Sequence, residues 1–274
     1  MTTTLRPTEP LQQQAGGARS RRFQVCVNSR PAGEIHIETS PALGPSVARV
    51  TGLRIDEPDR RRGRGTVAML AAEEVARGWG CGQVELLIPA GADAALRLAD
   101  SLGYTLRNRT MRKRLGEVPP ELPPGSRVRP MTEEEFAAWQ AAETVRYARQ
   151  WASRGLSEAD ARAKSAADHA ALLPDGLGTT GVWFGVLEHE GTRVGHLWLA
   201  PRDGETWIFD VETEAALRGR GHGRTLLLLA EARTIGRGEP TLMLNVFAGN
   251  TPAERLYESL GYETTRRTLY KPLL

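Results

Sequence analysis

The feature that most constrains the fold of this chain is an internal repeat. The pattern Arg-x-x-Gly-x-Gly occurs at residues 60–65 and again at 218–223, a spacing of 158 residues (218 − 60 = 158). The same spacing carries two further segments onto earlier ones: ERLYESLGY (254–262) onto LRLADSLGY (96–104), and RTLYKPL (267–273) onto RTMRKRL (109–115). A register without gaps over about sixty residues, with its glycines kept, indicates that one supersecondary unit was duplicated.

The length of 274 residues suits two domains of ordinary size. The stretch GEVPPELPPGSR (116–127) holds two Pro-Pro pairs, which continue neither a helix nor a central strand and favour an extended linker. The first twenty residues are polar, with no apolar core of a secretory signal. We therefore expect a flexible tail at 1–20, a first domain at 21–116, a Pro-rich linker at 117–127 and a second domain at 128–274.

The second copy has a legible order of elements. After a short strand, Thr132 and Glu135 form a capping-box pattern before a helix, and Ser157 is placed to cap a second helix. A hairpin around Glu190-Gly191, a further strand, the glycine stretch, two more helices and two strands follow. The first copy lacks the two opening helices. The order predicts an α/β (α+β) protein whose two domains each have a mixed, mostly antiparallel sheet flanked by helices, the first one shortened.

The glycine stretch has the form of an anion-binding device. A strand that ends in a glycine turn and runs into a helix presents free backbone N–H groups at the positive end of the helix dipole. Arg218, Arg220 and Arg224 add positive charge, so a diphosphate is the natural ligand. Two other interpretations are a solvated turn and the dinucleotide fingerprint G-x-G-x-x-A at Gly63, Gly65 and Ala68. The fingerprint lacks its usual context, because antiparallel-looking strands come first.

Composition excludes several classes of function. The net charge of +3 is too small to indicate a nucleic-acid partner. No apolar run approaches the ~20 residues that span a bilayer. Cys26 and Cys81 lie far apart, which fits a reducing compartment, and the histidines show no metal-ligand spacing. We expect a cytoplasmic protein without a metal and without a membrane or nucleic-acid partner.

At these residues the sequence resembles the GNAT superfamily of N-acetyltransferases. The segment 218–223 looks like that family's acyl-CoA pyrophosphate loop, and Asn250 with LYESLGY (256–262) resembles its second signature. The resemblance covers essentially residues 127–274 and about residues 22–115. It implies a tandem arrangement with a degenerate N-terminal copy, and a sheet splayed between its central strands, with the pantetheine of acetyl-CoA in the splay.

The resemblance also implies roles for individual residues. Backbone groups of Val211 and Thr213 would bind the pantetheine, and Asn250 would contact CoA in the next crossing. Residues of the loop would hold the pyrophosphate: Arg218, Gly219, Arg220, Gly221, His222, Gly223 and Arg224. A second loop of the same kind comprises Arg60, Gly63, Arg64 and Gly65.

Tyr257 occupies the position of the family's general acid. Amide transfer leaves CoA as a thiolate, and a phenol with a reference pKa near 10 can protonate it. The alternative for Tyr257 is a core aromatic on an apolar helix face. For the general base we favour Glu212, which shares a strand face with Asp210. A relay of the proton through water, without any side-chain base, is the other reading.

Acceptor-side residues are expected on the opening helices. Tyr147 and Trp151 lie one helical turn apart, and Glu143 precedes them by one turn, where it would attract a cationic amine. Core packing is the alternative for each. At the repeat spacing, Tyr257 falls on Ala99 and Asn250 on Ala92, so the first copy keeps its loop but not its acid. It would complete the fold, bind acyl-CoA without turnover, or carry an altered activity.

These observations predict an acetyl-CoA-dependent N-acetyltransferase. The second domain would transfer acetyl to a primary amine of a small molecule by direct attack in a ternary complex, and a homodimer is left open. The alternatives are a non-catalytic acyl-CoA sensor or scaffold, an acetyltransferase acting on a protein or peptide amine, and a nicotinamide-dependent oxidoreductase.

Overall fold

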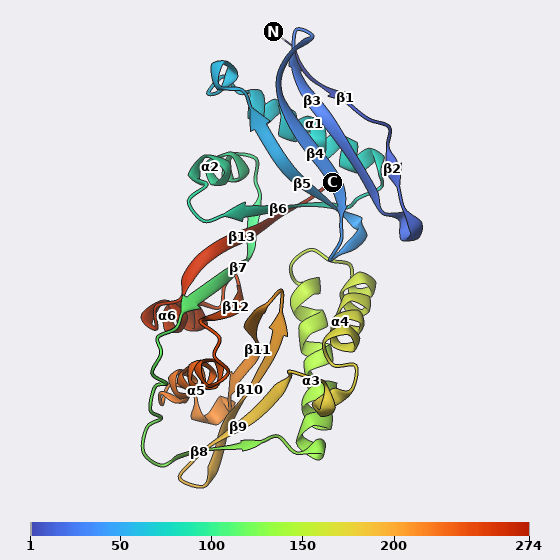
Figure 1. The fold of residues 1–274 in the computed structure, drawn as a ribbon. Coiled ribbons are helices and arrows are strands. Elements are labelled where there is room, and N and C mark those ends of the chain that lie inside the picture. The colour runs from blue at the N-terminus through green and yellow to red at the C-terminus, as the bar shows by residue number, and fades with distance from the viewer. Residues whose placement is uncertain (1, 274) are drawn as a thin grey trace. The chain divides into compact units, whose positions relative to one another are not determined.

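The computed structural model describes residues 2–273, and the chain divides into two compact units. Unit 1 comprises residues 1–108 together with 266–274, and unit 2 comprises residues 109–265. Figure 1 shows the elements of both units in the order of the chain.

Unit 1 is a mixed sheet with two α-helices among its described residues. Its elements are β1 (Thr3–Pro7), β2 (Gln12–Gln13), β3 (Arg19–Val27), β4 (Arg30–Ser40), β5 (Gly44–Ile55), α1 (Arg64–Gly78), β6 (Gln83–Pro89), α2 (Asp93–Ser101) and the start of β7 (Thr105–Arg114). The strand order is β1-β3-β4-β5-β6-β13, where β13 is Glu263–Pro272. Only β5 and β6 pair in parallel in this series.

Unit 2 has the same plan with two further helices. Its elements after β7 are β8 (Ser126–Pro130), α3 (Glu133–Ala152), α4 (Glu158–Leu172), β9 (Trp183–His189), β10 (Thr192–Arg202), β11 (Glu205–Thr213), α5 (His222–Gly236), β12 (Thr241–Phe247) and α6 (Thr251–Ser259). Its strands run β12-β11-β10-β9-β8, with only β11 and β12 parallel. The mixed, mostly antiparallel sheets and the shortened first copy are confirmed.

The final strands of the two repeat copies are exchanged, and this corrects the predicted domain boundaries. The last strand of the second copy pairs with β6 of unit 1, from Arg266 opposite Pro89 to Pro272 opposite Gln83. The end of β7, which belongs to the first copy, enters unit 2, where Met111 is fully buried in the core. The division therefore cuts through β7 and β13, and the Pro-rich segment 117–127 lies inside unit 2 rather than between domains.

The expected tail at residues 1–20 is a second correction. Strand β1 pairs antiparallel with β3, with Thr3 opposite Val27 and Pro7 opposite Phe23. Strand β2 pairs with the start of β3. Leu5 packs against the core of unit 1, which gives this segment an apolar anchor.

The two parallel strands of each unit pair over only part of their length. In unit 2, the pairing of β11 with β12 stops at Ile208 and Leu244, although β11 runs on to Thr213. In unit 1, the pairing of β5 with β6 stops at Val50 and Leu86, although β5 runs on to Ile55. A splay between central strands is thus present in both units, as the resemblance implied.

Alternation along β10 sorts side chains onto the two faces of the unit 2 sheet. Val194, Leu197 and Leu199 join the core under α5 and α6, which includes Leu226, Leu227 and Tyr257. Trp198 and Ala200 join a second core under α3 and α4, built around Phe136, Trp139 and Phe184. Side chains of β10 and β11 that point to α3 therefore lie beside an aromatic cluster, where buried charges must be paired.

Helix α3 begins with the predicted capping box. The Thr132 side chain accepts a hydrogen bond from the Glu135 N–H at 3.2 Å, and Glu135 accepts one from the Thr132 N–H at 2.9 Å. Hydrogen bonds from Arg129 help to lower the pKa of Glu135 to about 2. Ser157 caps α4, also as predicted. Across the described residues, no helix combines the length and the apolar character that crossing a membrane requires.

Candidate active site

The glycine loop of unit 2 connects β11 to α5. Gly219 and Gly221 have φ of 78° and 90°, a left-handed conformation that side chains rarely adopt. Gly223 is required for another reason, since a Cβ there would lie 3.2 Å from the Leu256 side chain of α6. The glycines therefore shape the turn and bring α5 close to α6.

The loop leaves a row of backbone donors without partners. Helix α5 has no side-chain cap, and the N–H groups of residues 219–223 donate to no acceptor among the described residues. Arg220 carries positive charge beside them, and Arg224 is held by a hydrogen bond to Ser259 at 2.7 Å. Such a nest of N–H groups at a helix start is suited to a diphosphate.

His222 begins helix α5 and lies beside His189 of β9, with ring centroids 5.3 Å apart. Burial and the neighbouring charges of His189 and Arg220 lower the pKa of His222. His222 is therefore neutral at neutral pH, and the positive charge of the loop comes from its arginines.

Unit 1 repeats the same loop geometry. Arg60 Nε donates to the carbonyl of Ile55 at 2.8 Å, as Arg218 Nε donates to the carbonyl of Thr213 at 3.2 Å. Gly63 has φ of 73° before α1. Gly65 approaches α2, since a Cβ there would lie 3.4 Å from the Leu98 side chain. Arg64, at the position of His222, donates to Thr3 of β1 at 3.1 Å.

The edge of β11 that faces the splay carries the predicted pantetheine residues. Val211 and Thr213 pair with Leu197 and Gly195 of β10 on one side, and their other edge has no pairing with β12. Asn250 has a structural role at the start of α6, where its side chain accepts a hydrogen bond from the Ala253 N–H at 3.4 Å. The free edge of β11 offers backbone groups to an extended ligand, as a strand edge does.

Tyr257 lies on α6 in the core under α5, with 7% of its surface exposed. Its hydroxyl makes no hydrogen bond to any described residue. Burial and the negative charge of Asp210 raise the pKa of Tyr257 to about 12. The phenol therefore keeps its proton at neutral pH, as a general acid must.

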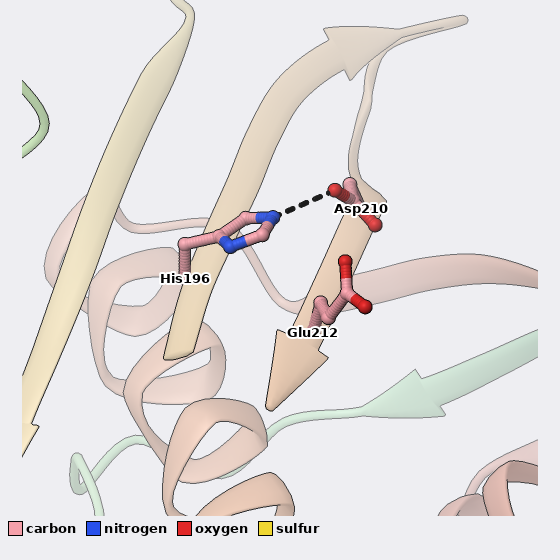
Figure 2. A group of neighbouring side chains, drawn as sticks. All are labelled: His196, Asp210 and Glu212. Carbon is pink, nitrogen blue, oxygen red and sulfur yellow. Dashed lines mark hydrogen bonds and ion pairs between the residues drawn. The ribbon is translucent and has the colours of Figure 1, made fainter. Parts of the chain in front are cut away.

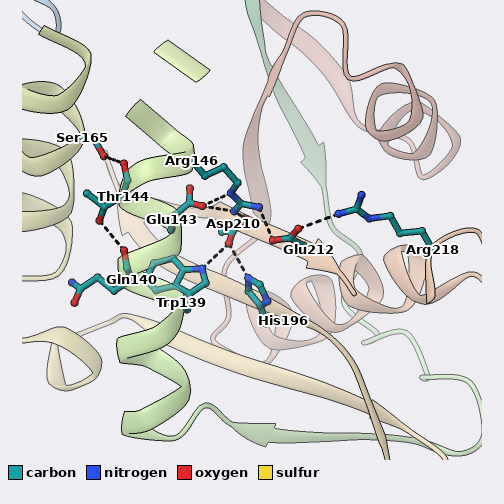
Figure 3. Close-up of polar contacts among 10 residues, drawn as sticks. All are labelled: Trp139, Gln140, Glu143, Thr144, Arg146, Ser165, His196, Asp210, Glu212 and Arg218. Carbon is teal, nitrogen blue, oxygen red and sulfur yellow. Dashed lines mark hydrogen bonds and ion pairs between the residues drawn. The ribbon is translucent and has the colours of Figure 1, made fainter. Parts of the chain in front are cut away.

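Asp210 is the centre of a buried polar network (Figure 3). Its Oδ2 accepts hydrogen bonds from Trp139 Nε1 at 2.8 Å and His196 Nε2 at 2.9 Å, and its Oδ1 accepts one from Arg146 at 2.9 Å. Although burial raises the pKa of Asp210, the hydrogen bonds and charges of His196 and Arg146 outweigh it and lower that pKa. Asp210 is therefore a fixed anion.

Arg146 joins three carboxylates. It donates to Asp210, to Glu212 of β11 and to Glu143 of its own helix. Glu212 also accepts a hydrogen bond from Arg218 of the glycine loop at 3.1 Å, so each of its oxygens contacts a guanidinium. A carboxylate held in this way has no oxygen free of a guanidinium for an acceptor amine. Glu212 as the base stays a prediction, and its surroundings do not favour it.

His196, Asp210 and Glu212 bring ligand atoms within 4.8 Å of one another, a grouping of the kind that holds metal ions (Figure 2). The donor set around them favours a different account. All four carboxylate oxygens already accept hydrogen bonds from protein groups, and Arg146 and Arg218 bring positive charge to them. The trio is thus explained as part of an ion-pair network.

A cavity of about 670 Å³ lies along α3 beside this network. It is lined by Trp139, Ala142, Glu143, Val145, Arg146, Arg149, Gln150, Ser153 and Glu212. Helix α3 is fixed against α4, because Ser165 donates to the Thr144 carbonyl at 2.8 Å (Figure 3). The cavity is large enough for a small molecule and has carboxylates on its wall.

The structure brings only part of the predicted acceptor set to this cavity. Glu143 lines it, whereas Tyr147 donates to Asp168 of α4 at 3.0 Å, and Trp151 packs against Phe247 with ring centroids 5.6 Å apart. Arg146 was not anticipated. The helical spacing of Trp139, Glu143 and Arg146 was the available signal, since it puts all three on one face of α3.

Comparison with protein families gives a match over most of the chain. The model of the "Acetyltransferase (GNAT) family" matches residues 2–104 and 138–262. These two regions correspond to the two copies of the repeat.

Individual relatives agree with this match. An uncharacterized N-acetyltransferase, YdgE, from Bacillus subtilis is 31% identical over 150 residues, which covers 52% of this chain and 95% of that protein. A mycothiol acetyltransferase from Streptomyces griseus is 30% identical over 267 residues, covering 91% of this chain and 79% of the relative. Among solved structures, a GCN5-related N-acetyltransferase from Sphaerobacter thermophilus shares the fold, with a TM-score of 0.58, 22% identity and coverage of 92% and 80%.

Proposed function

The chain belongs to the acetyltransferase (GNAT) family and is an acyltransferase, and from this premise we propose that unit 2 transfers acetyl from acetyl-CoA directly to a primary amine of a small molecule. The row of unpartnered N–H groups at residues 219–223 carries the proposal. It lies where β11 leaves its pairing with β12, so a diphosphate bound there would direct its thioester arm along the free edge of β11.

The residues of unit 2 divide the work. The N–H groups of the glycine loop hold the diphosphate, and the edge of β11 at Val211 and Thr213 holds the pantetheine arm. The cavity along α3 receives the amine. Tyr257 holds a proton for the thiolate that leaves when the acetyl carbonyl is attacked. Both substrates meet between α3 and the splay, and no covalent enzyme intermediate is needed.

The first copy lacks the groups that this chemistry uses. At the spacing of 158 residues, Asp210 is replaced by Gly52, Glu212 by Arg54 and Tyr257 by Ala99. Its loop geometry is kept, and its end strand β7 contributes Met111 to the core of unit 2. These features support a mainly structural role for unit 1, with catalysis in unit 2.

The names of several relatives suggest where to look for the amine. Two thirds or more of this chain aligns with several mycothiol acetyltransferases. The amine that those enzymes acetylate is therefore the first compound to test, within a set of amino sugars, amino acids, polyamines and peptides. An amine on a protein or peptide is the second candidate, and a non-catalytic acyl-CoA sensor is the third.

A CoA-release assay with matched loop variants tests the proposal. Gly221 and Gly63 both have positive φ and open space around a Cβ, so alanine strains each backbone equally. Strain of ~1–2 kcal/mol would move the loop out of its left-handed conformation and lower turnover about tenfold for Gly221→Ala, with little change for Gly63→Ala. If the protein binds acetyl-CoA but releases no CoA with any amine tested, the sensor is favoured. If only Gly63→Ala loses CoA release, catalysis belongs to unit 1.

A further inference from the structure

We propose that Glu143 of α3 is the catalytic base, which takes the proton from the acceptor ammonium before the amine attacks. This inference rests on the proposed function of unit 2, which names no proton acceptor, and it identifies the residue that serves as one. Glu143 is 8% exposed, and it lines the 670 Å³ cavity that Arg146 and Glu212 also line. A mostly buried residue that lines an open cavity can reach a ligand bound there, and solvent when the cavity is empty.

The three carboxylates of the network differ in what remains free. Both oxygens of Asp210 and both oxygens of Glu212 accept hydrogen bonds from neighbouring side chains. Arg146 binds only Oε2 of Glu143, and Oε1 has no donor among the described residues (Figure 3). Glu143 is therefore the network's one carboxylate with an oxygen available to an ammonium group in the cavity.

The surrounding charges suit this oxygen to proton transfer. The charged groups that face Glu143 are Arg146 on its own helix and Asp210 and Glu212 on β11. Burial, followed by the negative charge of Asp210, raises the pKa of Glu143 to about 7, although Arg146 opposes the shift. A base whose pKa lies near the working pH combines a large deprotonated fraction with adequate basicity.

Acetyl transfer in this scheme begins with deprotonation of the acceptor. The ammonium group of the acceptor gives one proton to Oε1 of Glu143 and becomes a neutral amine. The amine nitrogen forms a bond to the thioester carbonyl carbon, the carbon–sulfur bond breaks, and the sulfur leaves with the electron pair and takes the proton of Tyr257. The nitrogen of the new amide gives its extra proton to the Tyr257 phenolate. Glu143 releases its proton to solvent through the cavity, so each turnover releases one proton.

Arg146 acts as a positioning residue in this scheme. Its guanidinium binds Oε2 of Glu143 and leaves Oε1 without a donor, and its contacts with Asp210 and Glu212 connect α3 to β11. The cavity wall carries the carboxylates of Glu143 and Glu212 and the guanidinium groups of Arg146 and Arg149, so its charges balance. Within it, an acceptor ammonium finds its free carboxylate oxygen at Glu143.

The test is the pH dependence of kcat for the full chain at saturating acetyl-CoA and amine. The wild type is expected to lose activity below about pH 7 as Glu143 becomes protonated. Glu143→Gln is expected to lower kcat by ~10²–10⁴-fold and to remove this inflection, since a carboxamide accepts no proton at these pH values. Glu134→Gln, an exposed position on the same helix, serves as the matched control and should keep the wild-type profile.

A titration with acetyl-CoA and a circular dichroism spectrum confirm that each variant is folded and competent to bind. A Glu143→Gln enzyme that keeps both the rate and the inflection overturns the assignment. So does a Glu212→Gln enzyme that loses the inflection while Glu143→Gln retains it. If the wild type binds acetyl-CoA but turns over no amine, the proposed function itself fails, and the inference falls with it.

Discussion

Replacing Tyr257 with phenylalanine is expected to lower kcat by ~10²–10⁴-fold, the usual contribution of a positioned general acid. The hydroxyl of Tyr257 makes no hydrogen bond to the described residues, so its loss removes the proton donor without breaking a structural contact. The raised pKa of about 12 means that the phenol is protonated throughout the neutral range. Steady-state CoA release at pH 7.5 measures the effect, and affinity for acetyl-CoA should change little.

Tyr262 provides the matched control for this variant. It is 2% exposed in the same core, with its ring 5.9 Å from that of Tyr257, and its hydroxyl also lacks a hydrogen-bond partner within residues 2–273. Tyr262→Phe should leave kcat within about twofold of the wild type, because the hydroxyl has no part in the proposed chemistry. Full activity in Tyr257→Phe, or an equal loss in Tyr262→Phe, contradicts the role of Tyr257.

Replacing Asp210 with alanine is expected to destabilise unit 2 by about 3–5 kcal/mol, as for other buried charge pairs that lose one partner. Trp139, His196 and Arg146 all donate to this carboxylate, so its removal leaves the Trp139 and His196 donors without this acceptor and takes one of the three carboxylates from Arg146. The measurement is the urea midpoint followed by tryptophan fluorescence. Trp79 is the one tryptophan of unit 1, and the other five lie in unit 2, so the signal reports mainly on unit 2.

Glu158→Ala gives the contrast for that measurement. Glu158 pairs with Arg162 on the surface of α4, with 80% and 67% of the two side chains exposed. Exposed pairs of this kind contribute about 0.3–0.5 kcal/mol, so the midpoint should barely move. A loss below about 1 kcal/mol for Asp210→Ala would contradict the buried network, because two buried donors left without an acceptor cost more than that.

The glycine loop was predictable from sequence because its constraints are local. Gly219, Gly221 and Gly223 serve turn geometry and close packing, and both leave a mark in the spacing of glycines. The splay followed from the family resemblance, and the helix caps at Thr132 and Ser157 followed from short-range patterns. The turn glycines and the helix caps depend on residues within a few positions of one another, whereas the close approach of Gly223 to Leu256 and the splay are long-range features.

The strand exchange could not be predicted in the same way. RTMRKRL and RTLYKPL are copies of one segment, so either sequence suits either sheet. Which copy enters which unit depends on pairing at long range, such as that of β13 with β6. The N-terminal strand was missed because Leu5 is the one large apolar residue in Thr3–Pro7, too little for an alternating pattern.

To predict the acceptor-binding residues, one must know which face of α3 turns toward β11, and the sequence does not determine this. Large aromatic side chains suggested a pocket at Tyr147 and Trp151, yet these pack against α4 and Phe247. The face that meets β11 carries Glu143 and Arg146, whose partners Asp210 and Glu212 are more than sixty residues away. Hydrogen bonds at that separation decide which carboxylate remains free, and no local pattern records them.

The most direct measurement is the structure of the full chain with acetyl-CoA. We expect the diphosphate within hydrogen-bonding distance of the N–H groups of residues 219–223, and the thioester sulfur beside the Tyr257 hydroxyl. A complex in which unit 2 leaves this loop empty, with the diphosphate held elsewhere or only at Gly63 and Gly65 of unit 1, would contradict catalysis in unit 2.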